Sequence, residues 1–471
     1  MASLFIPKKT RNVLCSYEKG RALLAQVRWQ FVRNFSSSFI GAPKPSSWAT
    51  VENERLPILG SLAVGANNDS RSCQVTIVHE NTSARQALAL LMDDPNLVLV
   101  YRGTFGQGQQ LLAAVQRRLR NNPRHDKKLV QHETVTEQWL ALRQYKLRES
   151  HCLNRFLVQV NQPHHDLVDI TKSPAHISNI LREAAIPESC AMNYSGTYLL
   201  SLREINARVG SYQWRTKGVW VDALQNTIHP HFNVYPPTRQ EYLALLPHQI
   251  DCCTNHDSPL LMDIGTGTGI LTAIMLHRQP SLKAVATDTN PLAVACARDN
   301  FQRLGIDHRV TVQQTNLFPD TNVPADVLVC NPPWIPEVPV GGLYNSSDSM
   351  PWLDQAIYDT VNTNGQSMML HGFLQGARQY MRCRHSQVWL ILSDLAEHLN
   401  LRSQEELDQW IHDGGLTIIQ KRQATRVGSI GPLVRRSFTK PRLTDEERAF
   451  PLVAEARVAE RTFVYILTGI Q

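Results

Sequence analysis

Short apolar runs alternate with helix-forming stretches from residue 259 to the end of the chain. Seven of these runs have the length and character of buried strands, and they cover residues 260–263, 284–287, 310–313, 326–330, 388–392, 416–419 and 462–467. Glycine turns and helical stretches separate them at the spacing of βαβ units, in which parallel strands share one sheet covered by helices. The pattern predicts an α/β fold for this half, with a doubly wound, Rossmann-like sheet of seven strands.

The preceding part has a mixed pattern. Strand-like runs at 75–78 and 97–101 alternate with helical periodicity at 84–92 and 109–120, which predicts a smaller α/β or α+β domain without deciding between the two. A turn-rich segment around His229, Pro230, Pro236 and Pro237 indicates a boundary. We therefore expect three parts: a basic N-terminal arm (1–50), a substrate-recognition domain (51–230) and the larger α/β domain (231–471).

Composition narrows the class of protein. A chain of 471 residues is too long for one ordinary core, and its longest apolar runs are far shorter than the roughly 18 residues that span a bilayer, so we expect no membrane contact. The nine cysteines include no Cys-x-x-Cys pair, which favours a reducing compartment, the cytoplasm, over a disulfide framework. We expect no metal site, because three candidate pairs lack further ligands at suitable spacing: His229 with His231, His164 with His165, and Cys252 with Cys253.

The first fifty residues hold eight Lys and Arg against the single acid Glu18 and are rich in serine. This composition is typical of a mitochondrial transit segment. A basic first helix explains the segment equally well, since Leu23, Val27 and Phe31 recur near helical spacing. A mitochondrial matrix location therefore stays open beside the cytoplasm.

Positive charge continues into residues 102–155, which hold eleven basic and four acidic residues with Trp139 and Tyr145 interleaved. Such a stretch is typical of a surface that holds structured RNA, although a solvated helix face explains it equally well. Residues 51–230 carry 20 basic and 16 acidic residues, whereas residues 231–471 carry 20 and 24. The asymmetry suggests that substrate capture and chemistry are divided between domains.

The first strand of the larger domain leads into Asp263-Ile-Gly265-Thr266-Gly267-Thr-Gly269, and an apolar helix follows at once. Glycines allow positive φ in a tight turn and let a ligand lie against the backbone and the helix N-terminus. The alternating spacing differs from the dinucleotide fingerprint and resembles motif I of class I S-adenosylmethionine-dependent methyltransferases. The resemblance implies S-adenosylmethionine as the cofactor.

The ends of the next two strands supply further candidates for cofactor binding. Asp288, 25 residues after Asp263, can accept the ribose hydroxyls, as in the second motif of these methyltransferases; a helix N-cap is the alternative role. After the third strand come Asn316 and Leu317, where relatives commonly have Asp in place of Asn316 to hold the adenine amino group. An Asn oxygen can still accept from that amine.

The fourth strand runs directly into Asn331-Pro332-Pro333-Trp334. A planar amide or base nitrogen is a weak nucleophile because its lone pair is delocalised. The Asn331 oxygen and the Pro332 carbonyl can each accept one N–H and fix the line of attack, while Trp334 offers a face for stacking. The tetrapeptide resembles the (Asn/Asp)-Pro-Pro-aromatic motif of N-methyltransferases, with Trp334 in place of the commoner Tyr or Phe. A Pro-Pro turn with a buried Trp is the alternative interpretation.

Just before the domain, Thr238 and Arg239 lie in a segment that resembles the one closing over the cofactor in these enzymes, and Arg239 can grip a carboxylate with a bidentate fork. A helix starting at Thr238, with Glu241 completing a capping box, is an equally good account. After the fifth strand, residues 393–398 are candidates for the substrate mouth or a Ser-capped helix.

Over roughly residues 234–471 the chain is similar to the small-domain class I methyltransferases, which include ribosomal RNA guanine-N2 and release-factor glutamine enzymes. The resemblance implies an N-methyltransferase acting on an RNA base or a ribonucleoprotein substrate, our first hypothesis. A protein glutamine N-methyltransferase is the second, because it uses the same tetrapeptide. A non-catalytic, cofactor-binding RNA or assembly factor is the third.

Overall fold

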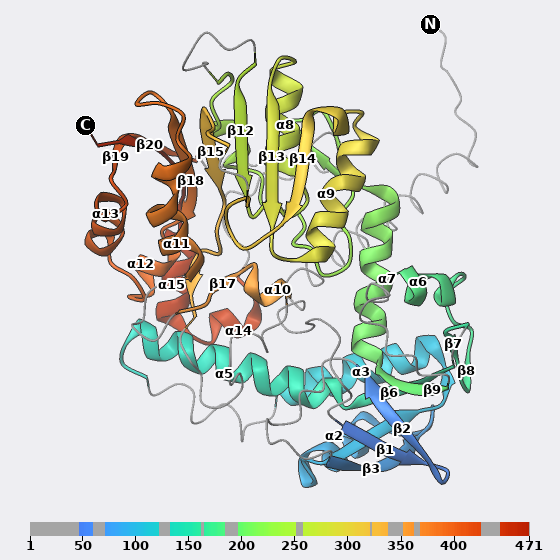
Figure 1. Ribbon diagram of the computed structural model, residues 1–471. Coiled ribbons are helices and arrows are strands. Elements are labelled where there is room, and N and C mark those ends of the chain that lie inside the picture. The colour runs from blue at the N-terminus through green and yellow to red at the C-terminus, as the bar shows by residue number, and fades with distance from the viewer. Residues whose placement is uncertain are drawn as a thin grey trace, which may run out of the picture.

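The structure is a computed structural model that describes residues 47–59, 71–121, 132–161, 164–183, 196–250, 258–320, 323–337, 352–361, 368–424 and 443–470. The predicted basic arm up to residue 46 and the pair Cys252–Cys253 lie outside these residues. The described part folds around two seven-stranded sheets (Figure 1).

The N-terminal sheet has the strand order β4-β3-β1-β2-β9-β6-β7, and β4 also pairs with β6. Six of its strands therefore form a closed ring, in which Leu99 lies opposite Phe156 and Ile58 lies opposite Leu199. Small apolar side chains such as Ala49 and Val98 fill the interior. The strands are β1 (Ser47–Val51), β2 (Glu54–Leu59), β3 (Arg71–Val78), β4 (Leu97–Tyr101), β6 (Phe156–Asn161), β7 (Asp166–Leu167) and β9 (Thr197–Ser201), with a separate short pair β5 (Gly103–Thr104) and β8 (Ile170–Thr171).

Helices cover the outside of this small barrel, where Tyr101, Phe156 and Leu200 pack against them. Two of these helices begin with a capping box, in which side chains bind the free backbone N–H groups of the first turn. Ser83 and Gln86 form the capping box of α2, and Thr134 and Glu137 form that of α5. The helices are α2 (Ala84–Asp93), α3 (Phe105–Arg120), α5 (Val135–Asn154), α6 (Ile177–Glu183) and α7 (Leu202–Lys217). The strands at 75–78 and 97–101 and the helices at 84–92 and 109–120 predicted from periodicity are confirmed; their closure into a ring was not predicted.

The C-terminal sheet has the order β14-β13-β12-β15-β18-β20-β19, with β20 antiparallel to both of its neighbours and the first five strands parallel. All seven predicted strands are present: β12 (Leu260–Ile264), β13 (Lys283–Asp288), β14 (Val310–Gln314), β15 (Val327–Cys330), β18 (Gln387–Ser393), β19 (Leu416–Gln423) and β20 (Thr462–Gly469). The central positions of β12, β13, β15, β18 and β20 are buried, as expected for a sheet covered on both faces, whereas the edge strands β14 and β19 are more exposed. The predicted doubly wound α/β fold is confirmed.

Two apolar cores lie on opposite faces of this sheet. One joins the helix α8 to residues of β12, β13, β15 and β18, and the other joins α11 and α13 to alternate residues of β12, β15 and β18. The elements around the sheet are α8 (Ile270–Arg278), α9 (Pro291–Arg303), η3 (Asp307–Arg309), β16 (Ile335–Pro336), α10 (Trp352–Gln355), β17 (Tyr358–Asp359), α11 (Met368–Ala377), η5 (Arg378–Tyr380), α12 (Leu395–His398), α13 (Gln404–Asp413), α14 (Asp445–Arg448) and α15 (Pro451–Ala459).

Helix α5 joins the two halves. It runs beneath the C-terminal sheet and reaches the barrel helices α3 and α7 at its other end (Figure 1). Trp139 and Leu142 pack with Ile335 and Tyr358, which belong to the strand pair β16–β17. The backbone N–H of Leu452 donates to Gln138, 3.0 Å away, and ties α5 to α15.

The turn-rich segment predicted as a boundary follows the hairpin β10 (Val219–Val221) and β11 (Asn226–Ile228). Val221 and Ile228 are buried in the core beside α8 rather than in the barrel. The hairpin therefore packs with the C-terminal sheet, although the predicted division at residue 230 assigns it to the other part. The three-part division itself stays a prediction.

Candidate functional site

The glycine turn joins β12 to α8 at the carboxyl edge of the sheet, and all three of its glycines have positive φ. A Cβ at Gly269 would lie 2.6 Å from the buried ring of Phe301, so close packing requires this glycine. A Cβ at Gly265 would lie 2.5 Å from the terminal methyl of Met369, the end of a flexible side chain that can move aside. A Cβ at Gly267 would meet nothing within 4 Å. The backbone at Gly267 is thus open toward the space where a ligand would lie.

Asp263 lies at the end of β12 and is fully buried. Its Oδ2 atom accepts hydrogen bonds from the hydroxyls of Thr266 (2.8 Å) and Thr272 (2.7 Å), whereas Oδ1 has no partner among the described residues. Burial raises the pKa of this carboxyl, and the two threonine hydroxyls oppose that shift. A buried, unpartnered oxygen beside an open glycine fits a ligand with a hydrogen-bond donor or positive charge, and the amino acid end of S-adenosylmethionine has both.

Asp288 ends β13 and faces the same turn. Its Oδ2 accepts from the backbone N–H of Gly267 and its Oδ1 from that of Asn290, both at 2.9 Å. Burial raises the pKa of Asp288 to about 6. The N-cap of α9 is Asn290, whose side chain accepts from the backbone N–H of Leu292. The alternative role of Asp288 as an N-cap is therefore wrong, and its link to the glycine turn favours ligand binding.

Asn316 and Leu317 follow β14 on the same edge. Asn316 is exposed, and its role toward an adenine stays a prediction. Leu317 has a positive φ, and its backbone carbonyl accepts a hydrogen bond from the hydroxyl of Thr287 at 2.6 Å. The Leu317 side chain lies against Gly372 of α11. The hydrogen bond from Thr287 ties the turn after β14 to β13, so Asp288 and Asn316 lie at or just beyond the ends of adjacent strands.

Asn331 follows the last residue of β15 and is fixed on both sides. Its Nδ2 donates to the hydroxyl of Tyr242 at 3.3 Å, and its Oδ1 accepts from the indole Nε1–H of Trp334 at 2.9 Å. The rings of Tyr242 and Trp334 meet edge to face, 6.3 Å apart. Pro332 and Pro333 are buried, whereas Asn331 and Trp334 are partly exposed. The tetrapeptide therefore presents a fixed amide and an aromatic ring beside the glycine turn.

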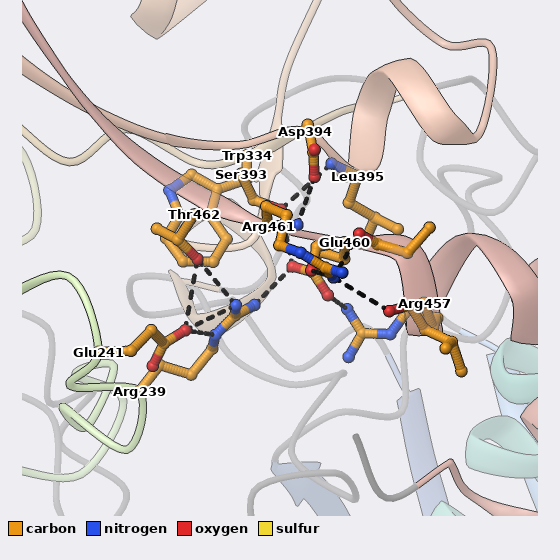
Figure 2. A network of polar contacts seen from close by, with 12 residues as sticks. Arg239, Glu241, Trp334, Ser393, Asp394, Leu395, Arg457, Glu460, Arg461 and Thr462 are labelled. Carbon is orange, nitrogen blue, oxygen red and sulfur yellow. Dashed lines mark hydrogen bonds and ion pairs between the residues drawn. The ribbon is translucent and has the colours of Figure 1, made fainter. Parts of the chain in front are cut away.

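Arg239 lies over the Trp334 ring, 4.6 Å from its centre, inside a network of polar contacts (Figure 2). Its guanidinium donates to Glu241 (2.8 Å), Glu460 (2.5 Å) and the hydroxyl of Thr462 (2.9 Å). Burial alone would lower the pKa of Arg239, but these two carboxylates outweigh it and raise that pKa. The fork predicted for a cofactor carboxylate is thus occupied by Glu241 and Glu460, while Arg239 still borders the site.

The backbone at Thr238 turns back, since its N–H donates to the carbonyl of Pro236 at 2.7 Å. No α-helix begins there; the next element is the 3₁₀ turn η2 (Leu243–Leu245). The predicted capping box at Thr238 is therefore wrong, and Glu241 pairs with Arg239 instead. A contact of Thr238 with the cofactor stays a prediction.

Three residues at this edge were not predicted from the sequence: Tyr242, Glu460 and Met369. Tyr242 lies in the segment that resembled the cofactor lid, and that resemblance was the available signal. Glu460 reaches Arg239 across 221 residues of chain, and no local pattern marks such a contact.

Among the substrate-mouth candidates, Ser393 ends β18, and the N-cap of α12 is Asp394, so the alternative of a Ser-capped helix is wrong. The Ser393 hydroxyl accepts from the N–H of Leu395 and donates to Glu460. Asp394 accepts from the backbone N–H of Arg461. Both side chains therefore brace the end of β18 against the start of β20.

The basic stretch at 102–155 is largely internal in its described part. Trp139 and Tyr145 are buried, which removes them as stacking platforms for bases. Four of its arginines are bound by the protein itself: Arg102 by Glu52 and Asp169, Arg120 by Glu149 and Glu446, Arg143 by Glu337 and the Tyr358 ring, and Arg155 by the carbonyls of Leu91, Asp94 and Leu97. Arg117, Arg118 and Arg148 are exposed.

Three of the candidate metal ligands have partners within the protein, and His165 Nδ1 lies 3.0 Å from the hydroxyl of Tyr198. His231 binds Asp299 at 2.9 Å, and the ring of His229 lies between the Arg215 carbonyl and the Thr227 hydroxyl. Within the described ranges, no three His, Cys, Asp or Glu side chains gather as a metal site would require. No helix in the described part is long and apolar enough to cross a membrane.

The sheet order, the glycine turn and the Asn-Pro-Pro-Trp loop together define a class I methyltransferase fold. Residues 246–339 match the family model described as the methyltransferase small domain. This match covers the glycine turn, Asp288 and the Asn-Pro-Pro-Trp tetrapeptide, and it confirms over this segment the resemblance predicted from the motifs.

Among curated proteins, the chain is 36% identical over 96 residues to a release factor glutamine methyltransferase of Moorella thermoacetica, which is 20% of this chain and 33% of that protein. It is 45% identical over 156 residues to a ribosomal protein L11 methyltransferase of Geobacillus kaustophilus, covering 29% and 49%. The chain thus spans between a third and a half of these two relatives. A solved methyltransferase of Pyrococcus furiosus is 16% identical over 52% of this chain and 90% of its own, with a TM-score of 0.30.

Proposed function

We propose that this protein is an S-adenosylmethionine-dependent N-methyltransferase whose acceptor is a planar nitrogen, and that the acceptor is a side-chain amide of a protein. The observation that carries the proposal is the fixed Asn331 amide, with its oxygen held beside the glycine turn that Asp263 and Asp288 flank. S-adenosylmethionine supplies an electrophilic methyl group when bound.

The chain's own residues supply the positioning. An amide oxygen has two lone pairs, so Oδ1 of Asn331 can accept one N–H of the acceptor while it keeps the bond from Trp334. The Pro332 carbonyl can accept the second N–H, which turns the nitrogen lone pair toward the methyl group. The new N–C bond would form as the S–CH3 bond breaks, with its electron pair left on the sulfur. A neutral amide oxygen is too weak a base to remove the proton first, so the N–H would be lost to water after methylation has made the nitrogen acidic.

Two observations favour a protein acceptor over the RNA base that we expected first. The buried Trp139 and Tyr145 and the paired Arg102, Arg120 and Arg155 leave a small exposed basic surface on the described part of 102–155. The relatives named above carry protein acceptors in their names, a release factor and a ribosomal protein. An RNA base remains the alternative acceptor.

The test is transfer of a labelled methyl group from S-adenosylmethionine into total protein and, separately, total RNA. We expect label in protein, at a glutamine or asparagine amide when the labelled peptides are sequenced by mass spectrometry. Label confined to RNA would establish the alternative acceptor. Cofactor binding without transfer into either fraction would favour the non-catalytic factor, and loss of both would contradict a methyltransferase.

Asn331→Ala and Asn331→Asp form a matched pair for this assay. Asp keeps acceptor oxygens at the same place, whereas Ala removes them, so we expect Asp to retain more activity. Both variants should bind S-adenosylmethionine within about threefold of wild type in a calorimetric titration, since Asn331 acts on the nitrogen rather than on the cofactor.

A further inference from the structure

The contacts of Trp334 differ from those of a simple stacking platform. The indole Nε1–H is a donor only, so the atom of Asn331 that it meets at 2.9 Å must be the oxygen. The Tyr242 hydroxyl on the other side can receive the Nδ2 donor. The amide is therefore fixed in one of its two orientations, the one that offers a lone pair to an acceptor N–H.

The Trp334 ring makes a cation–π contact with Arg239. The guanidinium of Arg239 covers one face, and the rings of Tyr242 and Trp334 meet edge to face. A phenylalanine could keep these ring contacts, but it has no N–H at the indole position. The hydrogen bond to Asn331 therefore depends on the tryptophan that replaces the family's commoner Tyr or Phe.

A buried set of ion pairs holds Arg239 in place (Figure 2). Glu460 is 4% exposed and binds Arg239 at 2.5 Å and Arg457 at 2.7 Å. Burial would raise the pKa of Glu460, yet the two guanidinium groups together lower it to about 2. Glu241 and Thr462 also accept hydrogen bonds from the guanidinium. Arg239 is therefore fixed both by a residue of its own segment and by residues at and just before the start of β20, which lie far away along the chain.

We infer that Trp334 is a positioning residue, which holds the Asn331 amide in its working orientation and is itself clamped by Arg239, Glu241 and Glu460. This inference rests on the proposed function and adds to it a device that sets the amide before any acceptor arrives. Arg239 acts on the acceptor side of the site through Trp334, not on the cofactor carboxylate.

The contact can be tested without activity, by nitrogen-15 indole resonances of the tryptophans. In Asn331→Ala we expect the Trp334 Nε1–H resonance, assigned by its loss in Trp334→Phe, to shift upfield and to exchange faster with water. The matched control is Trp389, whose Nε1–H donates at 2.9 Å to Gln387 at the opposite end of β18 and should not change. An unchanged Trp334 resonance would overturn the inference.

Kinetics test the role. Trp334→Phe keeps a ring against Arg239 and removes one hydrogen bond, so we expect kcat about tenfold lower, with S-adenosylmethionine affinity within twofold of wild type. Trp389→Phe removes the same kind of bond away from the site and should leave kcat unchanged. An unchanged kcat in Trp334→Phe, or an equal loss in cofactor affinity, would overturn the positioning role.

Arg239→Lys separates the clamp from the cofactor role. Lys keeps the charge near Glu241 and Glu460 but loses the planar stack on Trp334, so kcat should fall while cofactor affinity stays within twofold. A tenfold loss of cofactor affinity would return Arg239 to the cofactor carboxylate and overturn the clamp. A wild-type protein that binds the cofactor but transfers no methyl group would contradict the proposed function, and the Trp334 resonance would still decide whether the contact exists.

Discussion

The three glycines of the turn after β12 differ in the space beside their Cα atoms, and of the three only Gly267 has room for a Cβ atom. A Cβ there meets nothing of the protein within 4 Å, whereas Gly269 is closed by Phe301. Positive φ alone makes alanine costly at either position, by about 1–2 kcal/mol. An effect on cofactor binding must therefore be separated from this strain.

We predict that Gly267→Ala weakens S-adenosylmethionine binding at least tenfold, because its methyl group enters the space left for the ligand. Gly305 is the matched control, because its φ of 67° is close to the 56° of Gly267 and a Cβ there would also meet nothing within 4 Å. It lies after α9, away from the turn that follows β12. Gly305→Ala should lower the melting temperature similarly and leave binding intact. Equal binding losses, measured by calorimetry, would contradict the cradle at Gly267.

Asp288 predicts a pH dependence of cofactor binding. Its pKa of about 6 lies above the ordinary value of 3.8 because the carboxyl is buried, and ribose hydroxyls donate best to the ionised form. At pH 5 about a tenth of the sites are ionised, so the apparent Kd should be about tenfold weaker than at pH 7. Asp288→Asn should remove this dependence, and proton release on binding should be measurable in buffers of different ionisation enthalpy.

The same shift has the opposite sign for stability without cofactor. Because the folded state holds the Asp288 proton more tightly than the unfolded state, this group stabilises the fold below pH 3.8, and that contribution is lost as the pH rises through 6. Cofactor binding at neutral pH should therefore recover part of the stability that ionised Asp288 costs.

At the scale of single elements, helix α5 packs against both halves of the described part. It is buried on several sides because the barrel helices lie at one end and α12, α15 and the pair β16–β17 lie at the other. Since β16 begins at Ile335, directly after Trp334, the packing of α5 supports the loop that carries the tetrapeptide.

We predict that Leu142→Ala destabilises the protein by about 3 kcal/mol, because Leu142 is 1% exposed between α5 and the C-terminal half. The urea midpoint should fall, and kcat should fall with it as the loop after β15 loosens. Arg148→Ala, on an exposed position of the same helix, should change the midpoint little. A loss of stability without any change in kcat would separate α5 from the acceptor loop.

The sequence was sufficient for the elements and insufficient for several of their partners. The seven strands of the C-terminal sheet were predictable because each is an apolar run bounded by turn residues, and the glycine turn marked the cofactor edge. The barrel was not, since its closure rests on short pairings such as Ile58 with Leu199 between runs that local pattern does not connect. The role of Arg239 was missed for the same reason, because Glu460 lies 221 residues away.

At the scale of the whole molecule, the count of basic and acidic residues along the sequence overestimated the positive charge that residues 102–155 expose. The run at 102–155 has more basic than acidic residues, yet its described arginines mostly bind partners inside the fold, as Arg120 does with Glu149 and Glu446. What a charge run presents to a substrate depends on acids from elsewhere in the chain, such as Glu446 of α14. The net charge of a segment therefore says little about its partner until the pairs are known.

A charge reversal tests the acceptor at this scale. We predict that the triple variant with Arg117, Arg118 and Arg148 replaced by Glu keeps kcat/KM within about threefold for a protein acceptor, because these side chains are exposed and lie apart from the tetrapeptide. With total RNA as the acceptor, a loss beyond tenfold together with a shallower salt dependence than wild type would indicate phosphate contacts and favour RNA.

The position of β20 has a consequence for synthesis. This strand lies between β18 and β19 and pairs with both, yet it follows both along the chain. During translation the barrel can form while β18 and β19 still lack their shared neighbour. Glu460 lies two residues before β20 and clamps Arg239, so the clamp can form only after this segment has left the ribosome. A partly made chain that lacks β20 would then hold a folded glycine turn beside an Arg239 that lacks its clamp.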